Sequence, residues 1–230
     1  MGASMYDLYI ANKNYSSWSL RPWVLMRELK IAFREHLIPF GDESGWENFR
    51  KISPSGKVPC LVDGQTVVWD SLAIVEYLAE RENKVWPDQP GARAWARSAS
   101  AEMHSGFSEL RGRCSMTCGQ RIRLHEFPAP LERDVARLGT LWNDGLRRFG
   151  GPFLAGNAFT AVDAFFAPVA FRVNSYGLTL DAAAKGYVDR LLDTRAMREW
   201  YADALKETLR DQPHEEDVLR IGTVLEDLRA

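Results

Sequence analysis

The sequence has 230 residues, of which 46% are hydrophobic and 26% charged, so the chain can bury a core and form one large or two modest domains. Lys and Arg number 29 against 31 Asp and Glu, and the net charge of -2 gives no reason to expect nucleic acid or an anionic membrane as a partner. No apolar run approaches the roughly 20 residues of a membrane span, and the N-terminus has no signal-peptide pattern. We therefore expect a cytoplasmic protein that acts through a local binding site.

The first predicted elements form a β-α-β unit. Residues 6–11 alternate apolar and polar side chains in the manner of a short strand, which the polar residues 12–19 end. A helix is predicted to begin near Leu20, with Ser19 as its N-cap and Pro22 in its first turn. Residues 33–40 are predicted to form the second strand, and a loop with one helical turn follows to about Ser53.

A hairpin and a helix follow. The apolar runs 58–62 and 66–69 are joined by Asp63-Gly64, which is a strong hairpin signal, and residues 70–81 carry apolar side chains at helical spacing. The order β-α-β then β-β-α is that of a thioredoxin-like α/β domain, which we place at residues 1–82.

The rest of the chain is predicted to be helical. Residues 83–91 contain Pro87 and Pro90 and are interpreted as a linker, so that residues 92–230 form an all-α domain. Long helices are expected over 92–118 and 131–149. A further helix over 161–175 begins at the capping-box pattern Thr160-Ala161-Val162-Asp163, and two or more helices follow residue 182.

Three cysteines, Cys60, Cys114 and Cys118, form no CxxC pair and have no histidine at metal-ligand spacing. We therefore expect neither structural disulfides nor a metal site.

Two short motifs indicate a binding site. Pro59 lies in what should be the sheet interior, where proline is normally excluded. It therefore indicates an edge, a bulge, a strand entry or a cis turn. A cis Val58-Pro59 bond would present the Val58 backbone to an extended peptide. Asp70 and Ser71 precede a helix, where free amides favour a carboxylate, although either residue can equally serve as a simple N-cap.

The spacing from Val58-Pro59 to Asp70-Ser71, together with the capping box, resembles the glutathione transferase superfamily over nearly the whole chain. The resemblance implies that glutathione is a co-substrate, that no cofactor is tightly bound and that the protein is a homodimer. It implies that Val58 binds the cysteinyl part of glutathione through its backbone and that Asp70 and Ser71 hold its γ-glutamyl end, with Pro59 also part of the glutathione site. Lys57 is then placed to pair with the glycyl carboxylate.

The loop Tyr15-Ser16-Ser17-Trp18-Ser19 is similar to the serine-rich loop of the zeta class and, more distantly, of the theta and delta classes. A free thiol has a pKa of about 8.5 and is mostly protonated at neutral pH, whereas the thiolate is the nucleophile. In these classes a serine hydroxyl stabilises the glutathione thiolate. Alignment on Arg21 selects Ser16, whereas theta-like spacing selects Ser17. Tyr15 is an alternative donor. Serine forms no mixed disulfide, which argues against thiol exchange.

The second-substrate pocket is expected between this loop and the first long helix of the second domain. Its candidates also have ordinary interpretations as core or surface residues; they are Met103, His104, Phe107, Arg111 and Tyr176. Zeta-class isomerases hold a substrate carboxylate with an arginine in the helix after the capping box. The matching position here is Ser175, and the nearest arginine is Arg172, which departs from the maleylacetoacetate isomerase pattern.

Three functions remain open. The first is transfer of glutathione to an electrophilic, largely apolar co-substrate. The second is glutathione-dependent isomerisation, in which glutathione is released unchanged. The third is a non-enzymatic domain of the same fold that contacts other proteins, since fold alone does not determine function.

Overall fold

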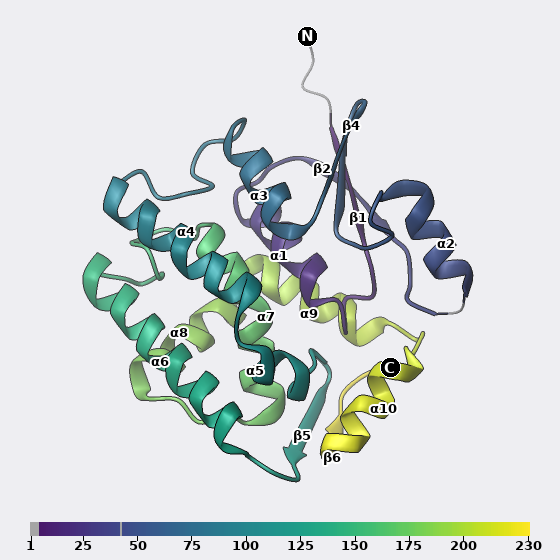
Figure 1. Cartoon of the computed structure of the whole chain (residues 1–230), viewed down its shortest axis with the longest axis vertical. Coiled ribbons are helices and arrows are strands. Elements are labelled where there is room, and N and C mark those ends of the chain that lie inside the picture. Colours follow the sequence, from purple (N-terminus) through teal and green to yellow (C-terminus); the bar gives the residue numbers. More distant parts are fainter. Residues whose placement is uncertain (1–4, 42) are drawn as a thin grey trace.

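The computed structural model describes residues 5–41 and 43–230, and its N-terminal region is a four-stranded sheet with helices packed beside it (Figure 1). Strand β1 (Tyr6–Ile10), helix α1 (Ser17–Glu28) and strand β2 (Phe33–Leu37) come first, followed by helix α2 (Glu43–Ile52). The region ends with β3 (Cys60–Asp63), β4 (Thr66–Trp69) and α3 (Ser71–Ala79). The strand order is β2-β1-β3-β4, with β1 parallel to β2 and the other pairs antiparallel. The predicted thioredoxin-like order is confirmed.

Helix α1 begins earlier than predicted. Ser16, rather than Ser19, occupies its N-cap position. Ser19 is fully buried in the first turn, and its hydroxyl accepts a hydrogen bond from the Ala11 N–H at 3.2 Å. The sequence pattern placed the cap wrongly because the Ser19 hydroxyl is used to fix the end of β1 to the helix, which is a tertiary contact. One further difference is that α2 has 10 residues where a single turn was expected.

The Val58-Pro59 peptide is cis, in agreement with one of the interpretations of Pro59. Asp70 is the N-cap of α3, where its carboxylate accepts from the Leu72 N–H at 2.8 Å. Asp70 has a φ of 74°, an unusual value for a residue other than glycine.

The second region is helical, with helices α4 (Pro90–Ser105), α5 (Ser108–Arg113), α6 (Ala129–Phe149), α7 (Ala161–Tyr176), α8 (Ala182–Asp193), α9 (Arg195–Lys206) and α10 (Gln212–Ile221). The expectation of one helix over 92–118 is wrong, because the chain turns at Gly106 and Phe107. Gly106, the C-cap of α4, has an extended backbone, and Phe107 has a φ of 53°, so neither residue continues the helix.

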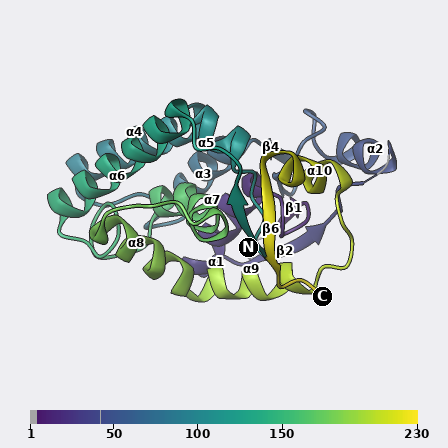
Figure 2. The same cartoon turned by 90° about the horizontal axis from the view of Figure 1, so that it is seen from below.

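The expected all-α character of this region also needs correction, because β5 (Gln120–Leu124) pairs antiparallel with β6 (Gly222–Asp227). Local patterns did not indicate these strands, because each pairs with a strand about a hundred positions away in the sequence. Figure 2 shows β6 and α10 beside the loop that joins β1 to α1.

Helix α7 is the centre of the helical region and packs against α1, α4 and α8. All of its 16 residues except Asn174 are buried. The predicted capping interaction is present, since Asp163 Oδ2 accepts from the Thr160 N–H at 2.9 Å. Oδ1 of Asp163 accepts from the Leu154 N–H and from the Tyr187 hydroxyl. These bonds fix the start of α7 to the preceding loop and to α8.

Helix α9 holds the loop that follows β1. The Trp200 indole donates to the Lys13 carbonyl at 2.8 Å, and the Lys13 ammonium pairs with Asp203 at 2.8 Å. Glu207 accepts from the backbone N–H groups of Lys13 and Asn14. The loop that leads to Ser16 is therefore fixed by the helical region. No helix in the described part of the chain is long and apolar enough to cross a membrane.

Candidate active site

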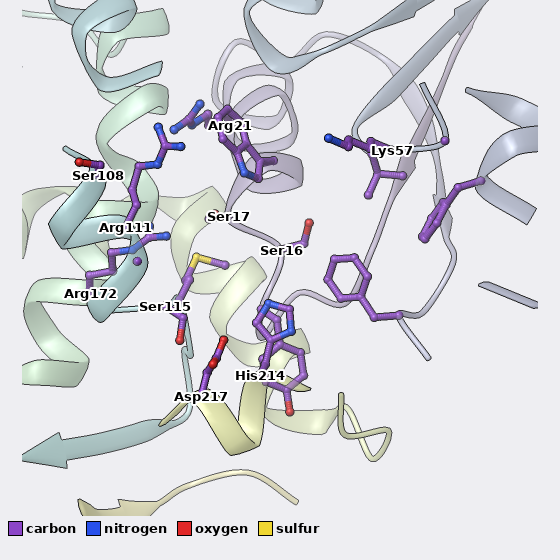
Figure 3. A pocket seen from close by; sticks show the side chains of 18 residues that line it. Ser16, Ser17, Arg21, Lys57, Ser108, Arg111, Ser115, Arg172, His214 and Asp217 are labelled. Carbon is purple, nitrogen blue, oxygen red and sulfur yellow. The ribbon is translucent and has the colours of Figure 1, made fainter. Parts of the chain in front are cut away.

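A cavity of about 550 Å³ lies between the two regions, with the loop after β1 on one side and α5, α7 and α10 on the other (Figure 3). Its polar and charged lining comes from segments far apart in the sequence: Tyr15, Ser16, Ser17, Arg21, Lys57, Ser108, Arg111, Ser115, Arg172, His214 and Asp217. Trp18, Phe40, Phe49 and Met116 supply apolar surface. The mixture suits a ligand that has both charged and apolar parts.

Ser16 and Ser17 both reach the cavity, and they differ in environment. Ser16 is 4% exposed, and its hydroxyl donates to Ser19 Oγ at 2.7 Å. Ser17 is half-buried and is the first residue of α1. Both hydroxyls therefore lie at the N-terminus of a 12-residue helix, whose free amides and dipole favour an anion such as a thiolate.

The Tyr15 hydroxyl is engaged elsewhere. It donates to Glu215 on α10 at 2.5 Å and accepts from Arg229 at 2.9 Å. Burial and the adjacent Glu215 carboxylate raise the pKa of Tyr15 to about 12. These contacts disfavour Tyr15 as the group that donates to a thiolate.

Of the five predicted glutathione-binding residues, two line the cavity and three lie outside its lining. Lys57 and Val58 line it directly, and Pro59 is buried immediately behind them. Ser71 is fully buried, and its hydroxyl accepts from Nη1 of Arg21, a cavity residue, at 3.3 Å. The N-terminus of α3 is thereby connected to the cavity through Arg21.

Asp70 is on the same helix end and is more exposed. Its carboxylate lies 3.5 Å from Nε2 of His104, which carries charge only when protonated. Burial lowers the pKa of His104, and this effect outweighs the attraction of Asp70. The Asp70 side chain is 45% exposed and lies outside the cavity lining, so its oxygen atoms are accessible to an ammonium group.

Of the five residues proposed for the second-substrate pocket, Arg111 lines the cavity. Met103 and Phe107 are buried in the hydrophobic core, and His104 contacts Asp70, Arg21 and Trp18. Tyr176 is buried behind the cavity, where its hydroxyl donates to the Ser115 carbonyl at 2.8 Å. The structure brings only Arg111 of this set to the cavity surface.

Sequence reasoning missed the contribution of the C-terminal helix. His214 and Asp217 of α10 face the cavity, and the His214 ring stacks on Tyr15 and Phe40. Local signals predict helices in this part of the chain but not the position of α10 at the cavity, because its contacts join it to the N-terminal loop about 200 residues away. Ser108 and Ser115 also line the cavity and were not predicted.

Arg21, Arg111 and Arg172 make this end of the cavity strongly cationic. Arg21 and Arg172 are 2% and 5% exposed. Burial, reinforced by the positive charges of its two arginine neighbours, lowers the pKa of Arg21 to about 9. The Nε of Arg21 is buried and has no hydrogen-bond partner among the described residues. Buried positive charges in this arrangement favour the binding of an anion.

The cysteines take no part in the site. Cys60, Cys114 and Cys118 are free and buried, and burial raises the pKa of Cys60 to about 11 and that of Cys114 to about 12. Among the described side chains of residues 5–41 and 47–230, no group of three or more His, Cys, Asp or Glu residues is placed to hold a metal ion.

Comparison with known proteins identifies the family to which this fold belongs. The family described as "Glutathione S-transferase, N-terminal domain" matches residues 15–81. Glutathione S-transferase Z2 of Arabidopsis thaliana is 30% identical over 172 residues, which cover 70% of this chain and 77% of the relative. A probable maleylacetoacetate isomerase of Caenorhabditis elegans is 27% identical over 195 residues, covering 82% of this chain and 87% of the relative.

A glutathione transferase homologue from Burkholderia GL BGR1, solved with bound glutathione, has the same fold. It superposes with a TM-score of 0.65 at 20% identity, covering 86% of this chain and 97% of that structure. The chain therefore belongs to the glutathione S-transferase family.

Proposed function

We propose that the protein is a glutathione transferase, in which Ser16 stabilises the thiolate of bound glutathione. The observation that carries the proposal is the position of the buried Ser16 hydroxyl at the N-terminus of α1, in the same cavity as Lys57 and Val58. A hydroxyl that donates to sulfur, together with the helix N-terminus, stabilises the thiolate over the thiol and lowers its pKa.

Glutathione would lie along the side of the cavity formed by the loop before β3 and the start of α3. The Val58 backbone would pair with its cysteinyl part, and Lys57 would pair with its glycyl carboxylate. At the γ-glutamyl end, the Asp70 carboxylate would receive the ammonium group, while the Ser71 hydroxyl and backbone amide would receive the carboxylate. Pro59 fixes the direction of the chain at Val58.

In the reaction, the thiolate attacks an electrophilic carbon of the second substrate and forms a carbon–sulfur bond. In a substitution the leaving group departs with the electron pair of its bond, and in an addition the resulting carbanion takes a proton from water. The protein supplies a positioned, charged nucleophile. Product analysis separates conjugation from isomerisation, because only conjugation consumes glutathione.

Calorimetric titration with reduced glutathione tests the binding site, with Asp70→Asn as the diagnostic variant. Asparagine keeps the capping oxygen and tolerates a positive φ, so the variant should unfold at the same temperature as the wild type. Loss of the carboxylate should weaken glutathione binding about tenfold, since a charge-assisted hydrogen bond contributes about 1.5–3 kcal/mol. Absence of saturable binding to the folded wild-type protein at millimolar glutathione would refute the proposal.

We also propose that the protein is a homodimer and that residues 1–82 and 92–230 act as two domains joined by a linker at 83–91. Light scattering during size-exclusion chromatography tests the dimer, since a monomer has a mass of 26.1 kDa. Limited proteolysis tests the boundary: first cleavage within 83–91 supports it, and first cleavage elsewhere contradicts it.

A further inference from the structure

Arg111 of α5 and Arg172 of α7, called here the arginine pair, line the cavity opposite the proposed glutathione side. In Figure 3 both side chains lie across the cavity from Lys57, with Ser16 between the two sides. The pair is therefore placed where the second substrate must approach the sulfur of glutathione.

Neutral backbone carbonyls fix both guanidinium groups. Arg111 Nη1 donates to the carbonyls of His104 at 2.8 Å and of Gly106 at 3.2 Å. Arg172 donates through Nε to the Cys114 carbonyl at 2.7 Å and through Nη1 to the Pro168 carbonyl at 3.3 Å. These bonds orient the two groups without neutralising them, and each guanidinium keeps further N–H donors.

Among the side chains that the structure describes, those of residues 5–41 and 47–230, neither arginine of the pair takes part in an ion pair. Asp217 is the carboxylate residue of the cavity lining, and it pairs with Arg220 on its own helix at 2.9 Å. Burial, with a smaller contribution from the charge of Arg111, lowers the pKa of Arg172 to about 10. Two cations close together and partly desolvated are stabilised most by an anion that contacts both.

Glutathione itself does not supply this anion in the proposed binding mode. Lys57 takes its glycyl carboxylate, while Ser71, with Arg21 bonded to it at 3.3 Å, takes its γ-glutamyl carboxylate. Once both carboxylates of glutathione have been placed, the positive charges of the arginine pair are therefore still not compensated by glutathione.

We propose that the second substrate carries a carboxylate that Arg111 and Arg172 bind together, which deepens the proposed transferase function and rests on it. Guanidinium groups bind carboxylates through pairs of parallel hydrogen bonds, so the arginine pair would both attract the substrate and set its orientation toward the sulfur. The hydroxyl-bearing residues Ser108 and Ser115 line the same side of the cavity. The expected substrate is thus an electrophile with an anionic end, in contrast to the largely apolar co-substrate expected from sequence.

Binding of glutathione conjugates tests this proposal without requiring turnover. S-(3-carboxybenzyl)- and S-(4-carboxybenzyl)glutathione extend a carboxylate to two distances from the sulfur, and the matching carbamoylbenzyl conjugates are neutral and nearly the same size. Calorimetry on the wild type should show one acid conjugate bound at least about tenfold more tightly than its amide. Arg111→Gln should remove that preference, and Arg172→Lys should reduce it because lysine lacks the planar pair of donors.

Arg113→Gln is the matched control, because Arg113 lies on the same helix, pairs with Glu109 at 3.0 Å and is outside the cavity lining. This variant should keep the full preference. Equal binding of acid and amide, or a preference that survives in Arg111→Gln, overturns the carboxylate proposal and leaves the transferase function standing. If Arg111→Gln weakens glutathione itself by the same factor, the arginine pair binds glutathione and the proposal is again wrong. Failure of every conjugate and of glutathione to bind the folded wild type refutes the transferase function.

Discussion

Replacement of Ser16 by alanine tests the proposed chemistry most directly. In the structure the Ser16 hydroxyl donates to Ser19 Oγ at 2.7 Å, so it must turn from Ser19 to the sulfur in order to stabilise a thiolate. This exchanges a neutral hydrogen bond of about 1 kcal/mol for a charge-assisted one of about 1.5–3 kcal/mol. The net gain of about 1 kcal/mol or slightly more corresponds to roughly one unit of thiol pKa.

The pKa of the bound thiol should therefore rise by about one unit in Ser16→Ala. The thiolate absorbs in the ultraviolet, so a pH titration of the protein–glutathione complex measures this pKa directly. With an active electrophile, kcat/KM of the variant should be about tenfold lower at pH values below the wild-type pKa. The two profiles should converge at high pH, where both thiols are ionised.

Ser17→Ala is the matched comparison, because its hydroxyl also lines the cavity. An unchanged thiol pKa in Ser16→Ala would refute the role of Ser16, and a rise confined to Ser17→Ala would transfer the role to Ser17. The fold should survive in Ser16→Ala, because Ser19 still accepts from the Ala11 N–H at 3.2 Å. Thermal unfolding checks that both variants are folded.

Three further predictions concern stability. Hydrogen bonds from Arg229 hold the pKa of Asp227 at about 2, below its usual 3.8, so the stability from this contact is present above that usual value and is lost as pH falls through about 2. Because the carboxylate side chain is 40% exposed, we expect the free energy of unfolding to fall by only about 1 kcal/mol. Urea unfolding at several acidic pH values measures this loss, and an equal loss in Asp227→Asn contradicts its assignment to Asp227. Gly145→Ala would place a Cβ 2.4 Å from the Trp95 ring and should destabilise the protein by about 1–3 kcal/mol. In Gly186→Ala the new Cβ meets open space on α8, so this variant should stabilise the protein by about 0.5–1 kcal/mol. A lower melting temperature for Gly145→Ala and a higher one for Gly186→Ala would support the two predictions.

The N-terminal fold was predictable because its signals are local. The Asp63-Gly64 turn, the helical spacing after Asp70 and the alternation in β1 each act over a few residues, and together they specify the order β-α-β then β-β-α. The capping box at Asp163 is equally local and marked the start of α7 correctly. The helix boundary near Ser19 was less predictable, because several serines in succession can each cap a helix.

The cavity lining was predictable only in part. Ser16, Lys57 and Val58 lie in motifs with a fixed spacing along the chain, and all three line the cavity. Arg172 appeared in the sequence only as a residue displaced from an expected position. Whether a side chain in the middle of a helix points into a cavity or into the core depends on the neighbouring helices, which periodicity does not reveal.

Local signals in the sequence specify the thioredoxin-like region, the succession of helices and the motifs that indicate glutathione. Tertiary structure alone decides the pairing of β5 with β6, the bonding of Tyr15 to Glu215 and Arg229, and the meeting of Arg111 with Arg172. The physical reason is the range of the interactions. Turns, caps and helical periods act between near neighbours, whereas these contacts join residues 61 to 214 positions apart whose proximity results from packing of the whole chain.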